Sequence, residues 1–330
     1  MSLPKEIAAG ARNWTAEVAA AWNRFWFEHR GPHTMACIRI LTGAMLVYVH
    51  TIWLSQLDDF FGQHAWINAE TFQSLHEQDY CWSYLAYTDN LWFLGLHEVA
   101  AIAVSAAMML GWQTRWACAL AWFMTLMVCH RQTGSLFGLD QVVMMLSMVL
   151  MICPCGRIAS LDAWRRGPDP RPSVAINVAT RLLQLHLCII YLFGGMSKLR
   201  GDFWWEGSAM WWSIVNYEYQ SFDMVWLGRS PFLIALLTHV TIFWETFYAA
   251  LIWPRLTRPI VLAMAVGVHG GIGLFLGMPT FGFMMIVANL AFLEPTLIAN
   301  WLQRRTSNVA DKATSPVPRK DYLRTTTVRQ

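Results

Sequence analysis

The sequence of 330 residues is poor in charge: 14% of its residues are Asp, Glu, Lys or Arg, while 56% are apolar. Soluble domains carry roughly 25% charged residues. The deficit is concentrated in long uncharged runs, which a bilayer with a hydrocarbon core about 30 Å thick accommodates as helices of about 20 residues. The composition therefore excludes an ordinary soluble enzyme and predicts a membrane protein.

Several signatures of catalytic and disulfide-linked proteins are also missing. There is no Gly-rich phosphate loop, no His-Glu-x-x-His and no Gly-x-Ser-x-Gly. Residues 1–30 hold no continuous apolar stretch, so no cleavable signal peptide is predicted. Of seven cysteines, Cys81 alone lies in a long loop, which argues against a disulfide framework. Cys153-Pro-Cys155 has no further Cys or His ligands nearby, so no metal site is predicted.

The sequence does contain eight apolar runs of the kind that cross a bilayer. They lie near 34–57, 92–110, 115–129, 138–154, 174–196, 231–253, 257–277 and 279–298, and the third and fourth are the shortest. We therefore predict an all-α, polytopic helical bundle of about eight transmembrane helices, formed by a domain over 34–300.

Basic residues are distributed unevenly between the two sides of this predicted bundle. With the N-terminus inside, the inner segments hold 18 Lys and Arg, the outer segments hold four, and two lie within spans. The loop 58–91 has six acidic residues and no basic one, which suits the outer side. Since cytoplasmic loops collect Lys and Arg, both termini are predicted to be cytoplasmic, in a plasma or inner membrane. The excess of basic residues on the cytoplasmic side also accounts for the net charge of +3, so no nucleic-acid partner is expected.

The two ends of the chain differ from the apolar middle. Residues 1–33 mix Trp and Phe with Arg and Glu, which predicts an interfacial amphipathic helix or a cap on the bundle. Residues 301–330 are polar and contain Pro316 and Pro318, which predicts a disordered cytoplasmic tail.

The fifth run carries a stripe of polar and small residues at helical spacing. Its members, separated alternately by four and three positions, are Asn177, Arg181, Gln184, Cys188, Tyr191, Gly195 and Lys198. Such a stripe in lipid faces the bundle interior or a wet cleft. Contacts between helices explain its middle equally well.

Lys198, at the end of the stripe, is the only lysine between the two tails; all other basic residues there are arginine. Arginine is effectively always protonated, whereas a lysine in an apolar site can lose its proton and act as a base. The alternative is a lysine that snorkels at a helix end. The Trp-rich segment that follows, with Trp204 and Trp205, predicts a short helix closing over this end.

Other polar residues inside the predicted spans leave alternatives open. Glu245, in the sixth span, could orient Lys198 or pair with Arg181 or Arg39. We predict that Arg39, Arg181 and Glu245 form a buried structural charge group, since an unpaired charge at mid-membrane costs about 2.5–3.5 kcal/mol. His269 lies among four glycines of the seventh span, where it could line a site or serve close helix packing.

The stripe's end also carries a recognisable motif. Tyr191-Leu192-Phe193-Gly194-Gly195-Met196-Ser197-Lys198-Leu199, followed by Trp204, Trp205 and Gly207, resembles the membrane domain of vitamin K-dependent γ-glutamyl carboxylases and their bacterial relatives, the horizontally transferred transmembrane (HTTM) family. Weaker matches follow in family order: Arg39 with Gly43, Leu110-Gly111-x-x-Thr114-Arg115, Ser160-Leu161-Asp162, Glu245, Arg258-Pro259 and His269. The resemblance covers about 34–300. The lipase maturation factors look similar around the lysine.

The resemblance implies a chemistry for the site. In the carboxylases a lysine at the position of Lys198 deprotonates a reduced naphthoquinone, and reaction with oxygen yields a strong base. That base removes a γ-proton from a peptide glutamate, and the carbanion captures CO₂. By this resemblance Lys198 is the catalytic base, and a vitamin K or menaquinol-like cofactor lies in a cleft lined by Trp204, Trp205, Tyr191, His269 and Glu245.

Two departures from the family argue against peptide carboxylation. The carboxylases have a large lumenal part, whereas this sequence ends soon after its last predicted span. They also use a histidine in the outer loop between the third and fourth spans, where only His130 lies nearby. Two functions of different class therefore stay open. One is a membrane enzyme using a prenylated quinol, with an unidentified protein substrate; the other is a non-catalytic assembly factor or lipid-binding protein.

Overall fold

The computed structural model describes residues 3–63, 65–77 and 80–300, with side chains described from residue 13 onward. In these ranges the chain is helical and contains no β-strand. Eight helices coincide in order with the eight predicted runs: α2 (His33–Ser55), α5 (Leu91–Leu110), α6 (Thr114–Arg131), α7 (Gly138–Ile152), α9 (Val174–Lys198), α12 (Pro231–Leu251), α13 (Arg258–Phe275) and α14 (Pro279–Asn289). The predicted all-α bundle is confirmed.

Five of these helices are long and apolar enough to cross a membrane within the described part of the chain: α2, α5, α9, α12 and α13. Helices α7 and α14 are apolar but shorter. Since the described chain combines these helices with a continuous apolar core, the protein is a multi-pass membrane protein. The sidedness deduced from the basic residues stays a prediction.

Local sequence explains where the long helices begin and end. The side chain of Asn90 accepts hydrogen bonds from the first amides of α5, including that of Trp92 at 3.0 Å. Gly111 ends α5 with φ of 71°, a left-handed conformation that glycine adopts without strain. Helices α12, α13 and α14 each have a proline in their first turn, where no amide donor is lost.

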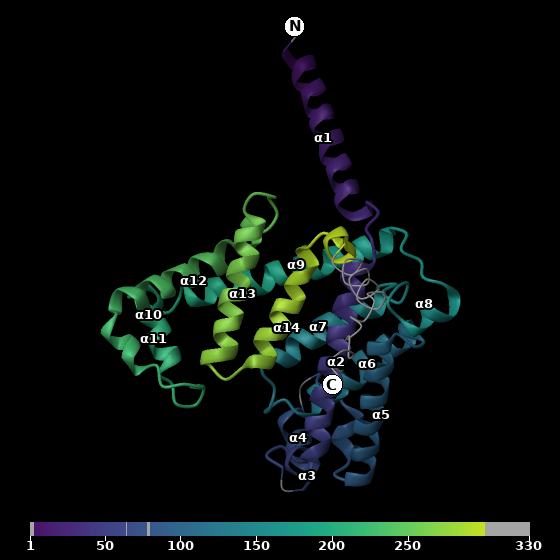
Figure 1. The fold of residues 1–330 in the computed structure, drawn as a ribbon, viewed down its shortest axis with the longest axis vertical. Coiled ribbons are helices and arrows are strands. Elements are labelled where there is room, and N and C mark those ends of the chain that lie inside the picture. The colour runs from purple at the N-terminus through teal and green to yellow at the C-terminus, as the bar shows by residue number, and fades with distance from the viewer. Residues whose placement is uncertain (1–2, 64, 78–79, 301–330) are drawn as a thin grey trace, which may run out of the picture.

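The bundle has two groups of helices that are joined by α7 and α14 (Figure 1). Helices α2, α5 and α6 pack consecutively on one side, and α9 packs against α12 on the other. Helix α7 contacts α2, α6, α9 and α14, while α14 also contacts α13. The candidate residues of the predicted site therefore lie in the α9–α12–α13 group, away from α2, α5 and α6.

Short helices fill the connections. They are α3 (Leu57–Phe61), α4 (Ala69–Leu75), η1 (Tyr84–Tyr87), α8 (Leu161–Arg166), α10 (Asp202–Trp205), α11 (Ala209–Ile214), η2 (Val225–Arg229) and η3 (Leu290–Phe292).

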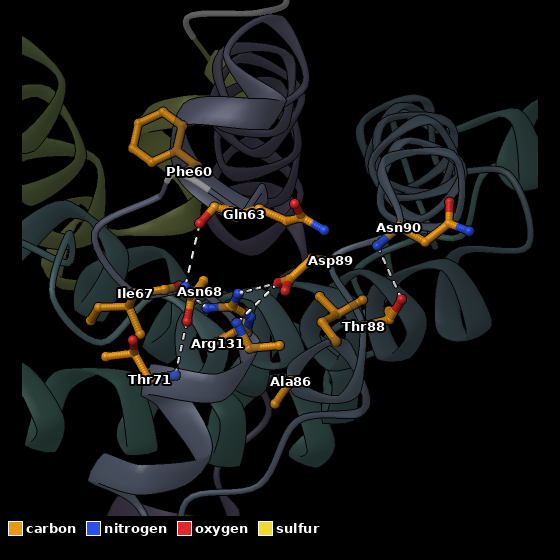
Figure 2. A network of polar contacts seen from close by, with 12 residues as sticks. Phe60, Gln63, Ile67, Asn68, Thr71, Ala86, Thr88, Asp89, Asn90 and Arg131 are labelled. Atoms are coloured by element: carbon orange, nitrogen blue, oxygen red, sulfur yellow. Dashed lines mark hydrogen bonds and ion pairs between the residues drawn. The ribbon is translucent and has the colours of Figure 1, made fainter.

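Arg131 anchors the long connection between α2 and α5 (Figure 2). This residue ends α6, and its side chain is fully buried. It donates to the carbonyl of Ile67 and pairs with Asp89 at 3.4 Å. Asp89 also accepts from the amide of Ala69 at 2.9 Å, so one guanidinium and one carboxylate join the middle of the connection to its end before α5.

The N-terminal helix α1 (Leu3–Phe27) projects away from the bundle (Figure 1). Trp14 and Trp22 are 65% and 61% exposed, and only its last turn packs on the bundle, where Phe25 lies against Trp253. That this helix lies in the membrane interface stays a prediction. The predicted tail, 301–330, lies outside the described residues.

Candidate functional site

The polar stripe of α9 faces the interior of the bundle, as predicted. The residues in its N-terminal half make structural contacts with other segments. Asn177 donates to the carbonyl oxygens of Phe25 and Trp26 at 2.8 and 3.0 Å, and Gln184 donates to Ala291 at 2.8 Å. These bonds join α9 to the last turn of α1 and to η3. Contacts between segments therefore explain the first half of the stripe.

The far end of the stripe contains an ion pair. Nζ of Lys198, in the last turn of α9, donates to Oε2 of Glu245 in α12 at 2.6 Å. The Lys198 side chain is 30% exposed and that of Glu245 is 12% exposed, so the pair is mostly removed from solvent. Of the partners that the sequence left open for Glu245, the structure brings it to Lys198.

Two glycines permit this pairing. A Cβ on Gly195 would lie 2.6 Å from the amide nitrogen of Thr246, which shows how closely the backbones of α9 and α12 approach. A Cβ on Gly194 would lie 3.4 Å from the Glu245 carboxylate and 3.9 Å from the Lys198 amine. The Gly-Gly step in the motif therefore brings two helix backbones together beside the ion pair.

Trp204 and Trp205 occupy different environments. The ring centroid of Trp204 lies 5.5 Å from Nζ of Lys198, within the range of a cation–π contact. Trp205 donates its Nε1–H to the carbonyl of Leu199 at 2.7 Å and is 64% exposed. The expectation that both tryptophans line the site is therefore wrong for Trp205, because its indole closes the end of α9 and faces outward.

Trp204 also forms part of the wall of a cleft of about 400 Å³. The rest of the wall is largely aromatic and apolar: Phe203, Trp212, Tyr219, Leu276 and Met278. These residues come from α10, α11 and the segment after it, and the turn between α13 and α14. Lys198 is not part of the wall, so the Trp204 ring lies between the amine and the cleft. Of the five residues expected to line a cleft, Trp204, Trp205, Tyr191, His269 and Glu245, only Trp204 lines this one.

Tyr191 and His269 meet in a buried hydrogen-bond network. The hydroxyl of Tyr191 bonds to Nε2 of His269 at 2.7 Å and accepts from Nδ2 of Asn289 at 2.9 Å. Tyr248 donates to Oδ1 of Asn289 at 2.6 Å, and its ring lies 4.0 Å from that of Tyr191. Nδ1 of His269 has no partner among the described residues. Tyr191 precedes Lys198 by seven residues, so the network lies about 10 Å deeper along α9.

The predicted charge group of Arg39, Arg181 and Glu245 is wrong. Arg39 is fully buried and donates to the carbonyls of Met108 and Met109 at the end of α5. Arg181 donates to the carbonyl of Phe25 at 3.0 Å. Both guanidiniums thus satisfy carbonyl groups at helix ends, a possibility that sequence reasoning passed over because it considered only charged partners.

A second buried polar cluster escaped the sequence analysis. Nδ1 of His50 bonds to Oε2 of Glu98 at 2.7 Å, and its Nε2 bonds to Thr125 at 3.1 Å, so the cluster joins α2, α5 and α6. All three residues are at most 1% exposed. The neighbouring His97 bonds to the hydroxyl of Tyr84 at 2.7 Å. Glu98 lies in the second apolar run, and the sequence could have indicated a buried partner for it, because carboxylates inside spans are costly and usually functional or paired.

The cysteines form no disulfide; all seven are free thiols, with Cys118, Cys153 and Cys155 buried. The described residues contain no group of three or more His, Cys, Asp or Glu arranged for a metal ion.

Comparison with known proteins identifies the family of the chain. The family model of the HTTM domain matches residues 27–297, which include the ion pair, the Tyr191 network and the cleft. A sporulation-delaying protein, SdpB, of Bacillus subtilis (strain 168) is 26% identical over 221 residues. That match covers 61% of this chain and 65% of SdpB, slightly less than two thirds of the relative's length. No solved structure matches.

Proposed function

This chain belongs to the HTTM domain family, and we propose that it is a membrane enzyme in which Lys198 and Glu245 remove a proton from a hydroxyl of a lipid-soluble substrate. The observation that carries the proposal is the ion pair itself. Its lysine is the only one between the chain's tails, it lies 2.6 Å from a largely buried carboxylate, and one indole separates it from an aromatic cleft.

The pair supports base chemistry better than a snorkelling lysine would. A snorkelling amine points to headgroups and needs no partner from another helix, whereas Nζ of Lys198 points to α12. In a site poor in water, an amine and a carboxylate can share one proton, either as an ion pair or as a neutral amine and acid. When a hydroxyl gives up its proton, the neutral amine of Lys198 takes it, which leaves an ammonium beside a carboxylic acid and a substrate anion balanced by the positive charge.

The cleft fits a naphthoquinone ring. Its volume of about 400 Å³ lies within the range of roughly 300–1,000 Å³ that small-molecule sites occupy, and its wall offers flat aromatic faces. Trp204, Trp212 and Tyr219 would hold the ring. A bound reduced naphthoquinone would supply a weakly acidic hydroxyl and two reducing equivalents. Trp204 must rotate for the amine to reach that hydroxyl.

The test replaces Lys198 with arginine in the full chain, purified in detergent. Arginine keeps the charge and the ion pair with Glu245 but cannot give up its proton. We expect Lys198→Arg to fold normally and to lower oxygen uptake driven by reduced menadione at least 100-fold, in keeping with the contribution of a general base. Glu206→Gln, which neutralises an exposed carboxylate beside the same segment, should leave uptake unchanged.

A second readout separates binding from chemistry. Quinone quenching of tryptophan fluorescence should be retained in Lys198→Arg and reduced in Trp212→Ala. Full oxygen uptake in a well-folded Lys198→Arg variant would refute the base role. Quenching that is unchanged when Trp212 is removed would show that the cleft does not hold the ring.

A further inference from the structure

A second cavity is lined by residues between Thr114 and Ala175, and Lys198 is not among them. It has a volume of about 590 Å³ and is enclosed by the first turn of α6, the end of α7, α8 and the beginning of α9. Three guanidinium groups line it, those of Arg115, Arg157 and Arg166. Figure 1 shows α8 on the periphery of the bundle. The proposed function uses none of these residues.

The carboxylates in this cavity are already engaged. Asp162 accepts from the amide and hydroxyl of Thr114 at 2.8 and 2.7 Å, and from the amide of Gln113 at 3.1 Å. Asp169 is bonded to Arg157 and, at 2.8 Å, to Arg171. These two arginines hold the pKa of the Asp169 carboxyl well below its usual range, so it stays charged and committed to them.

Arg115 and Arg166 differ from Arg157 in making no hydrogen bond and no close ion pair with any residue that the structure describes, although the charge of Arg166 helps to lower the pKa of Asp162. Both are exposed and both line the cavity, one from α6 and one from α8. Guanidinium groups bind phosphate by paired N–H···O bonds, so two of them that line one cavity offer donors to the same phosphate group. The chemistry available in the cavity is therefore that of a bound phosphate.

The surroundings of the cavity indicate that the phosphate is carried by a lipid. Trp112, Trp116 and Trp164 are 51%, 69% and 83% exposed on the same helices, α6 and α8, or just before them. Tryptophan concentrates where a membrane meets water, at headgroup level. Ile152, another wall residue, is 55% exposed, so the cavity has an apolar flank for acyl chains. Basic pockets between transmembrane helices at this level bind anionic headgroups.

We propose that Arg115 and Arg166 bind the phosphate of an anionic phospholipid, with Trp112, Trp116 and Trp164 at the level of its glycerol backbone. The site lies between the α6–α7 pair and the start of α9. An occupied site therefore joins the two groups of helices at the end of the bundle opposite the Lys198 cleft.

The experiment measures lipid binding to the full chain in detergent by native mass spectrometry, with palmitoyl-oleoyl phosphatidylglycerol as the probe. The double variant Arg115→Gln/Arg166→Gln should bind this lipid at least tenfold more weakly than the unaltered chain. The matched control is Arg165→Gln/Arg200→Gln, which removes the same charge from exposed arginines outside the cavity and should bind normally. Phosphatidylcholine should bind weakly to all three proteins.

Three results would overturn the proposal. An equal loss in both double variants would show that general surface charge attracts the lipid. Equal binding of phosphatidylcholine would show that the anionic headgroup is not recognised. In the third, millimolar inorganic phosphate would protect the lipid-free protein against heat, and phosphatidylglycerol would not compete with it. This result would identify the ligand as free phosphate. Independent support for the proposal would be a rise in melting temperature with added phosphatidylglycerol that disappears only in Arg115→Gln/Arg166→Gln.

Discussion

The Lys198–Glu245 pair makes a quantitative prediction about stability. At 2.6 Å, two unit charges in an effective dielectric of 20 attract by about 6 kcal/mol, before desolvation is subtracted. Removing one member of a buried pair typically costs about 3–5 kcal/mol. Because the lysine side chain is 30% exposed and water screens it, we reduce this to about 2 kcal/mol of coupling between the two side chains.

The assay is a double-mutant cycle with Lys198→Met, Glu245→Gln and the combined variant, each unfolded in mixed micelles by titration with a denaturing detergent. Either single change should lower the free energy of unfolding by more than half the effect of the double change. The control cycle uses Arg171→Gln and Asp169→Asn, a pair 2.8 Å apart whose arginine is 83% exposed. We expect its coupling to stay below about 1 kcal/mol.

The result that refutes this reasoning is a coupling between Lys198 and Glu245 no larger than that of the exposed pair. The amine would then be solvated rather than held against α12, and the base role would lose its geometric support. A coupling well above that of the control would establish the pair in the bilayer-mimicking micelle independently of any enzymatic activity.

Two further predictions concern the two halves of the bundle. Gly195→Ala should lower the melting temperature, because its Cβ would lie 2.6 Å from the backbone of Thr246. The control is Gly267→Ala, whose Cβ would have no atom within 4 Å and which should leave the melting temperature unchanged. Equal melting temperatures for the two variants would contradict the close approach of α9 and α12. His50→Ala should destabilise the protein by about 3–5 kcal/mol, because it leaves the Glu98 carboxylate buried without its partner. Adding Glu98→Gln to this variant should restore part of the lost stability. A double variant as unstable as His50→Ala alone would count against the pairing.

The fold followed from the sequence for simple physical reasons. A span must satisfy its own backbone hydrogen bonds and bury apolar side chains, so eight apolar runs imply eight helices whatever their arrangement. The inward face of α9 followed from the spacing of its polar residues, since positions three and four apart share a face. The family followed from the residues around Lys198, and the match over residues 27–297 confirms it.

The partners of the charged residues were decided only by the tertiary structure. Glu245 could reach Lys198, Arg181 or Arg39 as far as the sequence showed, and only the packing of α9 on α12 at Gly195 selected the lysine. Arg39 satisfies carbonyl groups of α5, which composition cannot reveal because every residue carries a carbonyl.

His50 and Glu98 lie 48 positions apart, and the indole of Trp205, next to Trp204 in the chain, faces outward. Periodicity describes one helix at a time, and neither feature belongs to one helix. The sequence by itself thus determined the class of the protein, its helices and the face of α9 that carries the lysine. The tertiary structure decided which charges meet, because that depends on how helices far apart in the sequence come together.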